Sequence, residues 1–225
     1  PRSTLFPYTT LFRSGNAYSA LAVRGKIGKK ENFAHLVPKY VYRNLQSVAN
    51  SSFPINLNDF SVQLYTLLSK AIDEEDSFGL TDYMDVSENI AGRIRSNIGK
   101  YTGYEDFVGL VHSKEYTKSR VYRALLHILL GIRKSDYAEC LEDCEVPYIR
   151  ILGFRQSSTA VLTEIKENCT VPVISKAADA ASILDDEAMY YFDQDIRAAN
   201  MYDMAAVFKF GKTPAHDFTR EVVII

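Results

Sequence analysis

"EYTKSRVYRALLHILLGI", residues Glu115–Ile132, is the stretch with the clearest structural pattern in this chain. Its apolar residues recur at the spacing i, i+4, i+7, i+8 and i+11, which places them on one face of an α-helix: Val121, Leu125, Ile128, Leu129 and Ile132. Gly131 stands near the end, as is typical of a helix C-terminus. The pattern therefore predicts a helix over Thr117–Ile132 that is buried along one side.

The segments before this helix carry the same helical period. Pro38 separates two short helices, and Asn56 or Asn58 can cap a third helix that ends in the charged turn "DEEDSFGL" (residues 73–80). The other predicted helices cover Lys29–Leu36, Lys39–Val48, Thr81 or Asp82 to Ile98, Tyr104–His112 and Lys134–Leu141. Together they predict a helical bundle over residues 29–145.

The pattern changes after residue 145. "VPYIRILGF" (Val146–Phe154) and "VPVIS" (Val171–Ser175) are each typical of a strand, and a helix from Ser157 or Ser158 to Asn168 separates them. Strand, helix and strand in this order predict a βαβ unit with parallel strands and a right-handed crossover. A long acidic helix from Asp186 to about Val207 follows, and "FTREVVII" at the end either adds a strand or docks as an extended tail. The predicted fold is mainly α, a helical bundle followed by a small α/β portion over residues 146–225.

Composition narrows the possible classes of function. The 225 residues are 47% hydrophobic, which is ordinary for a globular chain, and no run of 18 apolar residues predicts a membrane span. Cys140 and Cys144 lie one helical turn apart, but no histidine or further cysteine stands nearby at the spacing of a zinc site. We therefore expect reduced thiols in a cytoplasmic protein, and no metal site.

Charge is unevenly distributed along the chain. Residues 93–134 carry nine basic and three acidic side chains, whereas residues 135–225 carry eight basic and sixteen acidic ones. Such an excess of positive charge in one segment favours a polyanionic partner. The sequence has no Walker loop and no G-x-G-x-x-G, G-x-S-x-G, H-E-x-x-H or H-x-G-H motif. The basic segment is therefore the best candidate for a functional site.

The start of the helix over Thr117–Ile132 is the centre of this candidate site. Arg120 and Arg123 stand at i and i+3, where two guanidinium groups near a helix N-terminus suit phosphate. Tyr101, Tyr104 and Tyr116 lie among the charges and could stack on unpaired bases. The residues predicted to bind RNA are Arg120, Arg123, Lys118, Tyr116, Thr117, Arg93, Arg95 and Lys114. The alternative, a solvated basic face with tyrosines in the core, stays open.

The first fourteen residues fit no element of structure. "TLFPYTTLFRS" (Thr4–Ser14) has no helical period, its alternation is broken, and Pro7 stands in its middle. Read back through the genetic code, residues 1–14 resemble a widely used short-read sequencing adapter in one frame. We therefore expect residues 1–14 to be an adapter-derived tail, and we exclude them from the fold. No Met precedes Gly15, so we also expect the chain to be a C-terminal fragment.

Three motifs together resemble one bacterial family. "EYTKSRVYRALLHILLGI", "VPYIRILGF" and "VPVISK" are similar in order and spacing to the C-terminal half of the tRNA(Met) cytidine acetate ligases, which are HIGH-type nucleotidyltransferases. "AYSALAVRGKI" (Ala17–Ile27) resembles the family's S-A-T/S-x-I-R segment, in which Ser19 and Arg24 match. Leu21 and Ala22 replace the hydroxyl residues of that segment, which puts ATP contact at these two positions in doubt.

The resemblance implies a function for the parent protein. It implies that residues 15–28 end the nucleotidyltransferase domain, with Ser19 and Arg24 contacting ATP, and that residues 29–145 hold tRNA. ATP, with Mg²⁺ as its accompanying metal, would activate acetate as acetyl-adenylate, and the acetyl group would pass to N4 of the wobble cytidine in elongator tRNA(Met). The H-x-G-H motif would lie upstream, so we expect no acetylation by this fragment alone. The alternative is a non-catalytic helical scaffold that binds RNA or protein, and the oligomeric state stays open.

Overall fold

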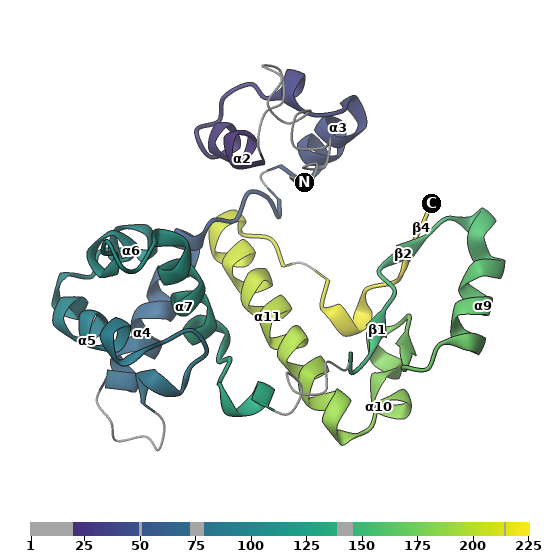
Figure 1. The fold of residues 1–225 in the computed structure, drawn as a ribbon. Helices are drawn as coiled ribbons and strands as arrows, with labels where there is room; N and C mark the ends of the chain where they lie inside the picture. Colours follow the sequence, from purple (N-terminus) through teal and green to yellow (C-terminus); the bar gives the residue numbers. More distant parts are fainter. Residues whose placement is uncertain (1–19, 50, 73–78, 139–145, 214) are drawn as a thin grey trace, which may run out of the picture.

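Helices make up most of the computed structural model, which describes residues 20–49, 51–72, 79–138, 146–213 and 215–225. Two short parallel sheets of two strands each complete it. Figure 1 shows three groups of elements around one long helix, α11: a pair of helices, α2 and α3, a bundle of α4 to α7, and a C-terminal lobe that contains the strands. The prediction of a mainly α chain is confirmed.

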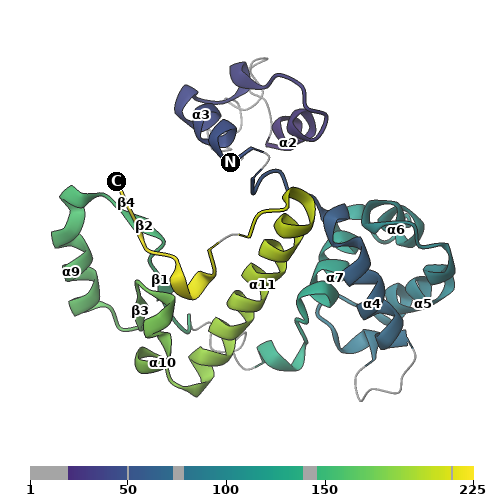
Figure 2. The same ribbon diagram turned by 180° about the vertical axis from the view of Figure 1, so that it is seen from behind.

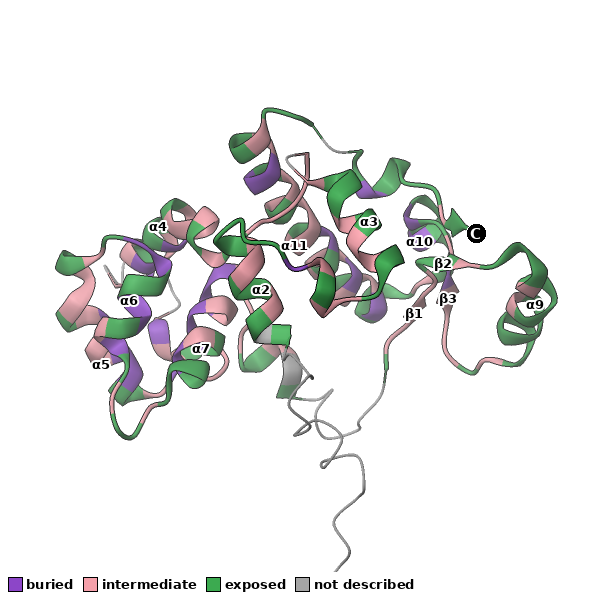
Figure 3. Cartoon of the chain, turned by 90° about the horizontal axis from the view of Figure 1, so that it is seen from above, coloured by how far each residue is buried: buried purple, intermediate pink, exposed green. Residues whose placement is uncertain are grey.

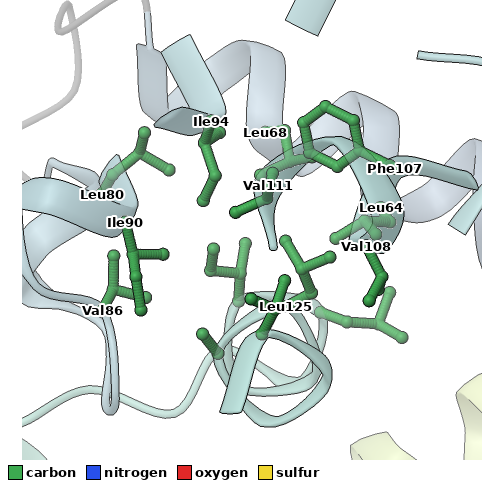
Figure 4. Close-up of a cluster of buried hydrophobic side chains, with 14 of the residues drawn as sticks. Leu64, Leu68, Leu80, Val86, Ile90, Ile94, Phe107, Val108, Val111 and Leu125 are labelled. Carbon is green, nitrogen blue, oxygen red and sulfur yellow. The ribbon is translucent and has the colours of Figure 1, made fainter. Parts of the chain in front are cut away.

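The bundle encloses the main hydrophobic core (Figure 4). Its helices are α4 (Ser61–Ile72), α5 (Glu88–Asn97), α6 (Tyr104–Val111) and α7 (Lys118–Leu130). Short 3₁₀ helices join or extend them: η2 (Leu57–Phe60), η3 (Leu80–Asp82) and η4 (Ile98–Lys100). The side chains with no exposed surface include Leu64, Leu68, Ile90, Ile94, Phe107 and Leu125. Each such burial contributes roughly 1.5–3 kcal/mol relative to an exposed side chain.

Helix α7 forms as its pattern predicts. Val121, Leu125 and Ile128 are fully buried along one face. Thr117 caps the N-terminus by accepting a hydrogen bond from the Arg120 amide at 3.4 Å. Gly131 closes the C-terminus in the left-handed conformation, with φ 73°, where a residue without Cβ is favoured.

Two other predicted helices are wrong in their bounds. The first helix is α2 (Ala20–Gly28), and residues 29–36 contain only the 3₁₀ turn η1 (Ala34–Leu36). The reason is a Schellman motif: Lys30 is left-handed, with φ 58°, and the amides of Lys30 and Glu31 bond to carbonyls of α2. The next helix, α3 (Lys39–Val48), begins directly after Pro38 as predicted.

The helix predicted from residue 81 begins only at Glu88. Residues 80–82 form only the 3₁₀ helix η3, and residues 82–84 pair with the chain beyond α7: the amide of Met84 donates to Ile132 and the amide of Lys134 donates to Asp82. Asp85 is left-handed, with φ 61°, and interrupts any helix at that point. Ser87 then caps α5 by accepting a hydrogen bond from the Ile90 amide.

The predicted strand over residues 146–154 is divided between two sheets. β1 (Ile149–Arg150) pairs in parallel with β3 (Val173–Ile174), and β2 (Gly153–Phe154) pairs in parallel with β4 (Val223–Ile224). The split occurs because the amide of Ile151 still donates to Ile174, whereas the carbonyl of Leu152 already accepts from Val223. The final stretch of the sequence therefore adds a strand.

Helical elements surround these strands. They are η6 (Gln156–Ser158), α9 (Thr159–Asn168), η7 (Ala177–Asp179), α10 (Ala180–Ile183) and η8 (Asp217–Thr219). Ile174, Ala177, Ala180, Phe192 and Ile196 form the small core of this lobe. Helix α9, in contrast, carries no buried residue, as Figure 3 shows.

Helix α11 (Asp186–Phe210) lies between the bundle and the C-terminal lobe in both views of Figures 1 and 2. Asp185 caps its N-terminus and left-handed Gly211 closes its C-terminus. Near its start, Phe192 packs in the core of the lobe. Near its end, Tyr202 donates to the carbonyl of Ser52, and Lys209 forms an ion pair of 2.7 Å with Asp59 of η2. The helix thus connects the two cores.

Candidate nucleic-acid interface

A tight turn positions Tyr116 at the start of α7. The amide of Ser113 donates to the Tyr116 carbonyl at 3.1 Å, and the Tyr116 amide donates to Ser113 Oγ at 3.2 Å. The phenol oxygen of Tyr116 accepts a hydrogen bond of 3.0 Å from Asn89 Nδ2 on α5. These contacts fix the half-buried ring between the first turns of two helices.

Arg120 lies over this ring. Its Cζ is 5.1 Å from the ring centroid, a distance typical of a cation–π contact. Lys114, Lys118 and Arg120, which precede or begin α7, are exposed, and so are the nearby acids Glu88 and Glu115. The start of α7 therefore offers three cations and one aromatic side chain to solvent, with a smaller excess of positive charge than the sequence segment as a whole.

Arg123 does not join Arg120. Its Nε and Nη2 donate to the two carboxylate oxygens of Asp85 at 3.0 and 3.1 Å, a bidentate pair. His127 Nδ1 lies 3.4 Å from the same carboxylate and 3.2 Å from the Met84 carbonyl. The two arginines that the helical spacing places on one side thus have different neighbours, and the charge of Arg123 is partly balanced.

Two further basic side chains hold the fold together. Arg93 donates from Nη2 to the carbonyls of Leu110 at 3.3 Å and His112 at 2.7 Å, and from Nε to Val111, all at the C-terminus of α6. Lys134 donates to the carbonyls of Thr81 and Val86. Arg95 is half-buried on α5 and also has an interaction partner.

The three tyrosines considered for base stacking occupy different environments. Tyr104 is fully buried, its hydroxyl donates to the Tyr122 carbonyl at 3.1 Å, and burial raises its pKa. Tyr101 donates to the Ser61 carbonyl at 2.8 Å and stacks near Phe107, and its pKa is raised by burial too. Tyr104 belongs to the core, and half-buried Tyr101 packs against it beside Phe107, whereas half-buried Tyr116 lies under the exposed Arg120.

A groove of about 750 Å³ separates α2 from the bundle. Arg24 and Lys29 line one side of it, and Glu105 lies on the other. The rest of the lining comes from Ile55–Phe60, Tyr122 and Tyr202. Sequence reasoning missed this groove because its walls come from five separate segments. The only local signal was the asparagine pair Asn56 and Asn58, which serves in capping and loop contacts.

Residues expected at the nucleotide-binding segment can be placed only in part. Arg24 is exposed and lines the groove, and Ala22 is exposed. Ser19 lies outside the described residues, as do Cys140 and Cys144. Within the described ranges, no helix has the length and hydropathy needed to cross a membrane. No three His, Cys, Asp or Glu side chains come together as metal ligands in that part of the chain.

Comparison with known proteins gives a consistent result. The family model described as HIGH Nucleotidyl Transferase matches residues 7–215. A tRNA(Met) cytidine acetate ligase of Thermoanaerobacter sp. (strain X514) is 29% identical over 98% of this chain and 55% of that protein. The ligase of the same description from Caldanaerobacter subterraneus subsp. tengcongensis is 32% identical over 88% of this chain and 47% of its own length.

A solved structure shares the fold. The crystal structure of Thermotoga maritima TmcAL bound with alpha-thio ATP superposes with a TM-score of 0.81 at 20% identity, covering 94% of this chain and 52% of that one. The chain thus spans about half the length of the curated relatives and of the solved structure that it matches.

Proposed function

This chain belongs to the HIGH nucleotidyl transferase family, and on that basis we propose that it is the tRNA-binding part of a tRNA(Met) cytidine acetate ligase. The parent enzyme would use ATP and acetate to form N4-acetylcytidine at the wobble position of elongator tRNA(Met), in the cytoplasm. The relatives described above are named tRNA(Met) cytidine acetate ligases, which supports this proposal. Because no H-x-G-H motif occurs in these residues, the chain alone would not acetylate tRNA.

The proposed division of the chain follows the same reasoning. Residues 1–14 are the adapter-derived tail, residues 15–28 end the nucleotidyltransferase domain, residues 29–145 hold tRNA, and residues 146–225 form the small α/β portion with a βαβ order. The parallel pairing of β1 with β3, which flank α9 in sequence, supports the last assignment. Helix α11 does not belong to the small α/β portion alone, because it also packs against the bundle.

The groove beside α2 suits ATP in size, and it offers two cations beside the carboxylates of Asp59 and Glu105. Its volume of about 750 Å³ lies in the usual range for small-molecule sites, and Arg24 and Lys29 supply two cations for phosphate oxygens. ATP would supply the energy that activates acetate. The part of this chain would be to bind and orient the phosphates through Arg24 and Lys29. Replacing Arg24 with Ala in the full-length enzyme should weaken ATP binding and leave tRNA binding unchanged.

The observation that carries the tRNA assignment is exposed Arg120 over the Tyr116 ring at the start of α7, where Lys114 and Lys118 are exposed in the same stretch of sequence. Protein–RNA affinity that depends on such contacts falls with salt, with a slope of about 0.7–0.9 per phosphate neutralised. Arg120 should contribute a full contact. Arg123 should contribute less, because Asp85 already balances its charge.

The test is tRNA binding by the full-length enzyme across a range of salt concentrations. The double substitution Arg120→Ala and Arg123→Ala should weaken binding and flatten the salt dependence, while ATP binding stays unchanged. Lys176→Ala, which removes an exposed cation of the C-terminal lobe, is the matched control. A salt slope in the double variant equal to that of the unmodified enzyme would contradict the assignment.

A second function, a non-catalytic scaffold that binds RNA or protein, is favoured by Leu21 and Ala22. Neither side chain can offer a hydroxyl to a phosphate where the family pattern has hydroxyl residues. In that case the full-length protein would bind tRNA without measurable affinity for ATP. Equilibrium ATP binding to the unmodified full-length protein separates the two functions.

A further inference from the structure

We propose that Tyr116, Arg120 and Asn89 form a subsite for one unpaired nucleotide, with its base stacked on the Arg120 guanidinium. This inference rests on the proposed function, in which the same end of the bundle binds RNA. It goes beyond that function by assigning the part of the RNA that is recognised and the chemical contact that recognises it.

The Tyr116 ring provides a fixed support for the guanidinium. One side of the ring packs on the core of the bundle, and the ring is held by the turn at Ser113 and by Asn89. Arg120 lies over it at 5.1 Å. An arginine already ordered on an aromatic ring loses less side-chain entropy when a ligand binds than one that moves freely in solvent.

The Arg120 guanidinium remains available to a ligand. The residue is exposed, and no carboxylate in the described part of the chain forms an ion pair with it. A guanidinium is planar, so it can stack on a base while its N–H groups donate to phosphate. Lys114 and Lys118 are exposed cations near Arg120 in the sequence, and they could neutralise phosphates elsewhere along a bound strand.

Asn89 supplies contacts for the edge of a base. One N–H of its amide donates to the Tyr116 hydroxyl at 3.0 Å. A carboxamide has a second N–H and an acceptor oxygen, a combination that can bond to the donors and acceptors of a nucleobase edge. A planar guanidinium and a carboxamide together match a nucleobase, which offers an aromatic face and a hydrogen-bonding edge, better than they match an acidic peptide, whose carboxylates offer no aromatic face for stacking.

Pairing excludes a base from this subsite. Inside a duplex, both faces of each base are covered by neighbouring pairs, so an internal base must be unpaired to offer a face to Arg120. The contact should therefore strengthen binding of single strands and have little effect on duplex RNA. Base stacking on a protein side chain changes affinity by about 5-fold to about 150-fold.

The test compares two probes, a short single-stranded oligouridine and a blunt RNA duplex, by fluorescence anisotropy with the whole chain. Arg120→Lys keeps the charge and removes the planar group, so it should lower affinity for oligouridine at least 5-fold, with an unchanged salt slope and unchanged duplex binding. Tyr116→Leu keeps apolar packing and should have the same effect. Lys118→Ala, the control for charge alone, should weaken both probes and flatten the salt slope.

The possible failures are distinguishable. Oligouridine binding by Arg120→Lys equal to that of the unmodified chain would overturn the subsite and leave the proposed function standing. Absence of RNA binding by the unmodified chain would overturn both. If polyglutamate displaced oligouridine as effectively as RNA does, base recognition would also be overturned. Because Arg120 is exposed, Arg120→Lys leaves the packing of the hydrophobic core unchanged. Circular dichroism verifies that the variants are folded.

Discussion

Replacement of Arg93 should reveal a structural function for a basic residue that the charge pattern assigns to RNA. The guanidinium donates to three consecutive carbonyls at the C-terminus of α6, those of Leu110, Val111 and His112. These are groups that a helix leaves without partners, and they lie at the negative end of its dipole.

The contacts give the magnitude of the effect. A hydrogen bond to a charged group contributes about 1.5–3 kcal/mol, and a cation at a helix C-terminus adds about 0.3–1 kcal/mol. Since one side chain makes all three bonds and water can replace part of them, we expect Arg93→Ala to lower the free energy of unfolding by about 2–4 kcal/mol. Arg93→Lys keeps the charge but not the forked geometry, and it should recover about half of the loss.

The assay is urea unfolding followed by far-UV circular dichroism, because the chain has no tryptophan. Hydrogen exchange of the α6 amides localises the change. Arg155→Ala removes an exposed arginine of the C-terminal lobe and should change stability by less than about 0.5 kcal/mol. If Arg93→Ala were as stable as this control, with α6 exchange unchanged, the reasoning would be refuted, and the guanidinium would be available to RNA after all.

Three further predictions follow from single contacts. Gly153→Ala would place a Cβ 2.9 Å from the Val223 carbonyl in β4, so hydrogen exchange of the β4 amides should accelerate. Gly109→Ala would meet nothing within 4 Å and should stabilise α6 by about 0.5–1 kcal/mol. Equal exchange of the β4 amides in both variants would contradict this. Asp85→Asn keeps a residue that tolerates the left-handed conformation, and it removes the negative charge that balances Arg123. The salt slope of RNA binding should therefore steepen by about 0.7–0.9, but not when Arg123 is also replaced with Ala. Burial raises the pKa of Tyr104 above its unfolded value of 10.0, so its contribution to stability is complete below that pH and declines as the pH rises above it. Tyr104→Phe should therefore make alkaline unfolding less steep, and an identical pH profile of unfolding would count against this cause.

Local patterns were sufficient to predict much of the helical fold. The apolar period of α7, its cap at Thr117 and its glycine at the C-terminus lie within one segment, and each acts through neighbours a few residues away. The start of α3 after Pro38 is local in the same sense. Such elements can be predicted from the sequence because the contacts that form them join residues only a few positions apart.

The remaining features depend on contacts that sequence spacing does not contain. No α-helix forms over residues 80–87 because residues 82–84 pair with the chain beyond α7, about 50 residues away along the sequence. Arg123 turns to Asp85, which lies 38 residues before it. The spacing of Arg120 and Arg123 correctly places both on one side of α7, but only the tertiary neighbours decide which guanidinium stays available.

The length of α11 has a consequence for how this fold can vary. The helix has 25 residues, about 37 Å, with Phe192 in one core and Tyr202 and Lys209 held by the other side of the molecule. One residue inserted between these contacts would rotate everything beyond it by about 100° and advance it by about 1.5 Å. An insertion of seven residues would restore the orientation to within about 20° but would displace the two cores by about two turns. Helix α11 therefore fixes the relative position of the bundle and the C-terminal lobe, and an insertion in it would disturb the fold more than an insertion of the same length in an exposed loop.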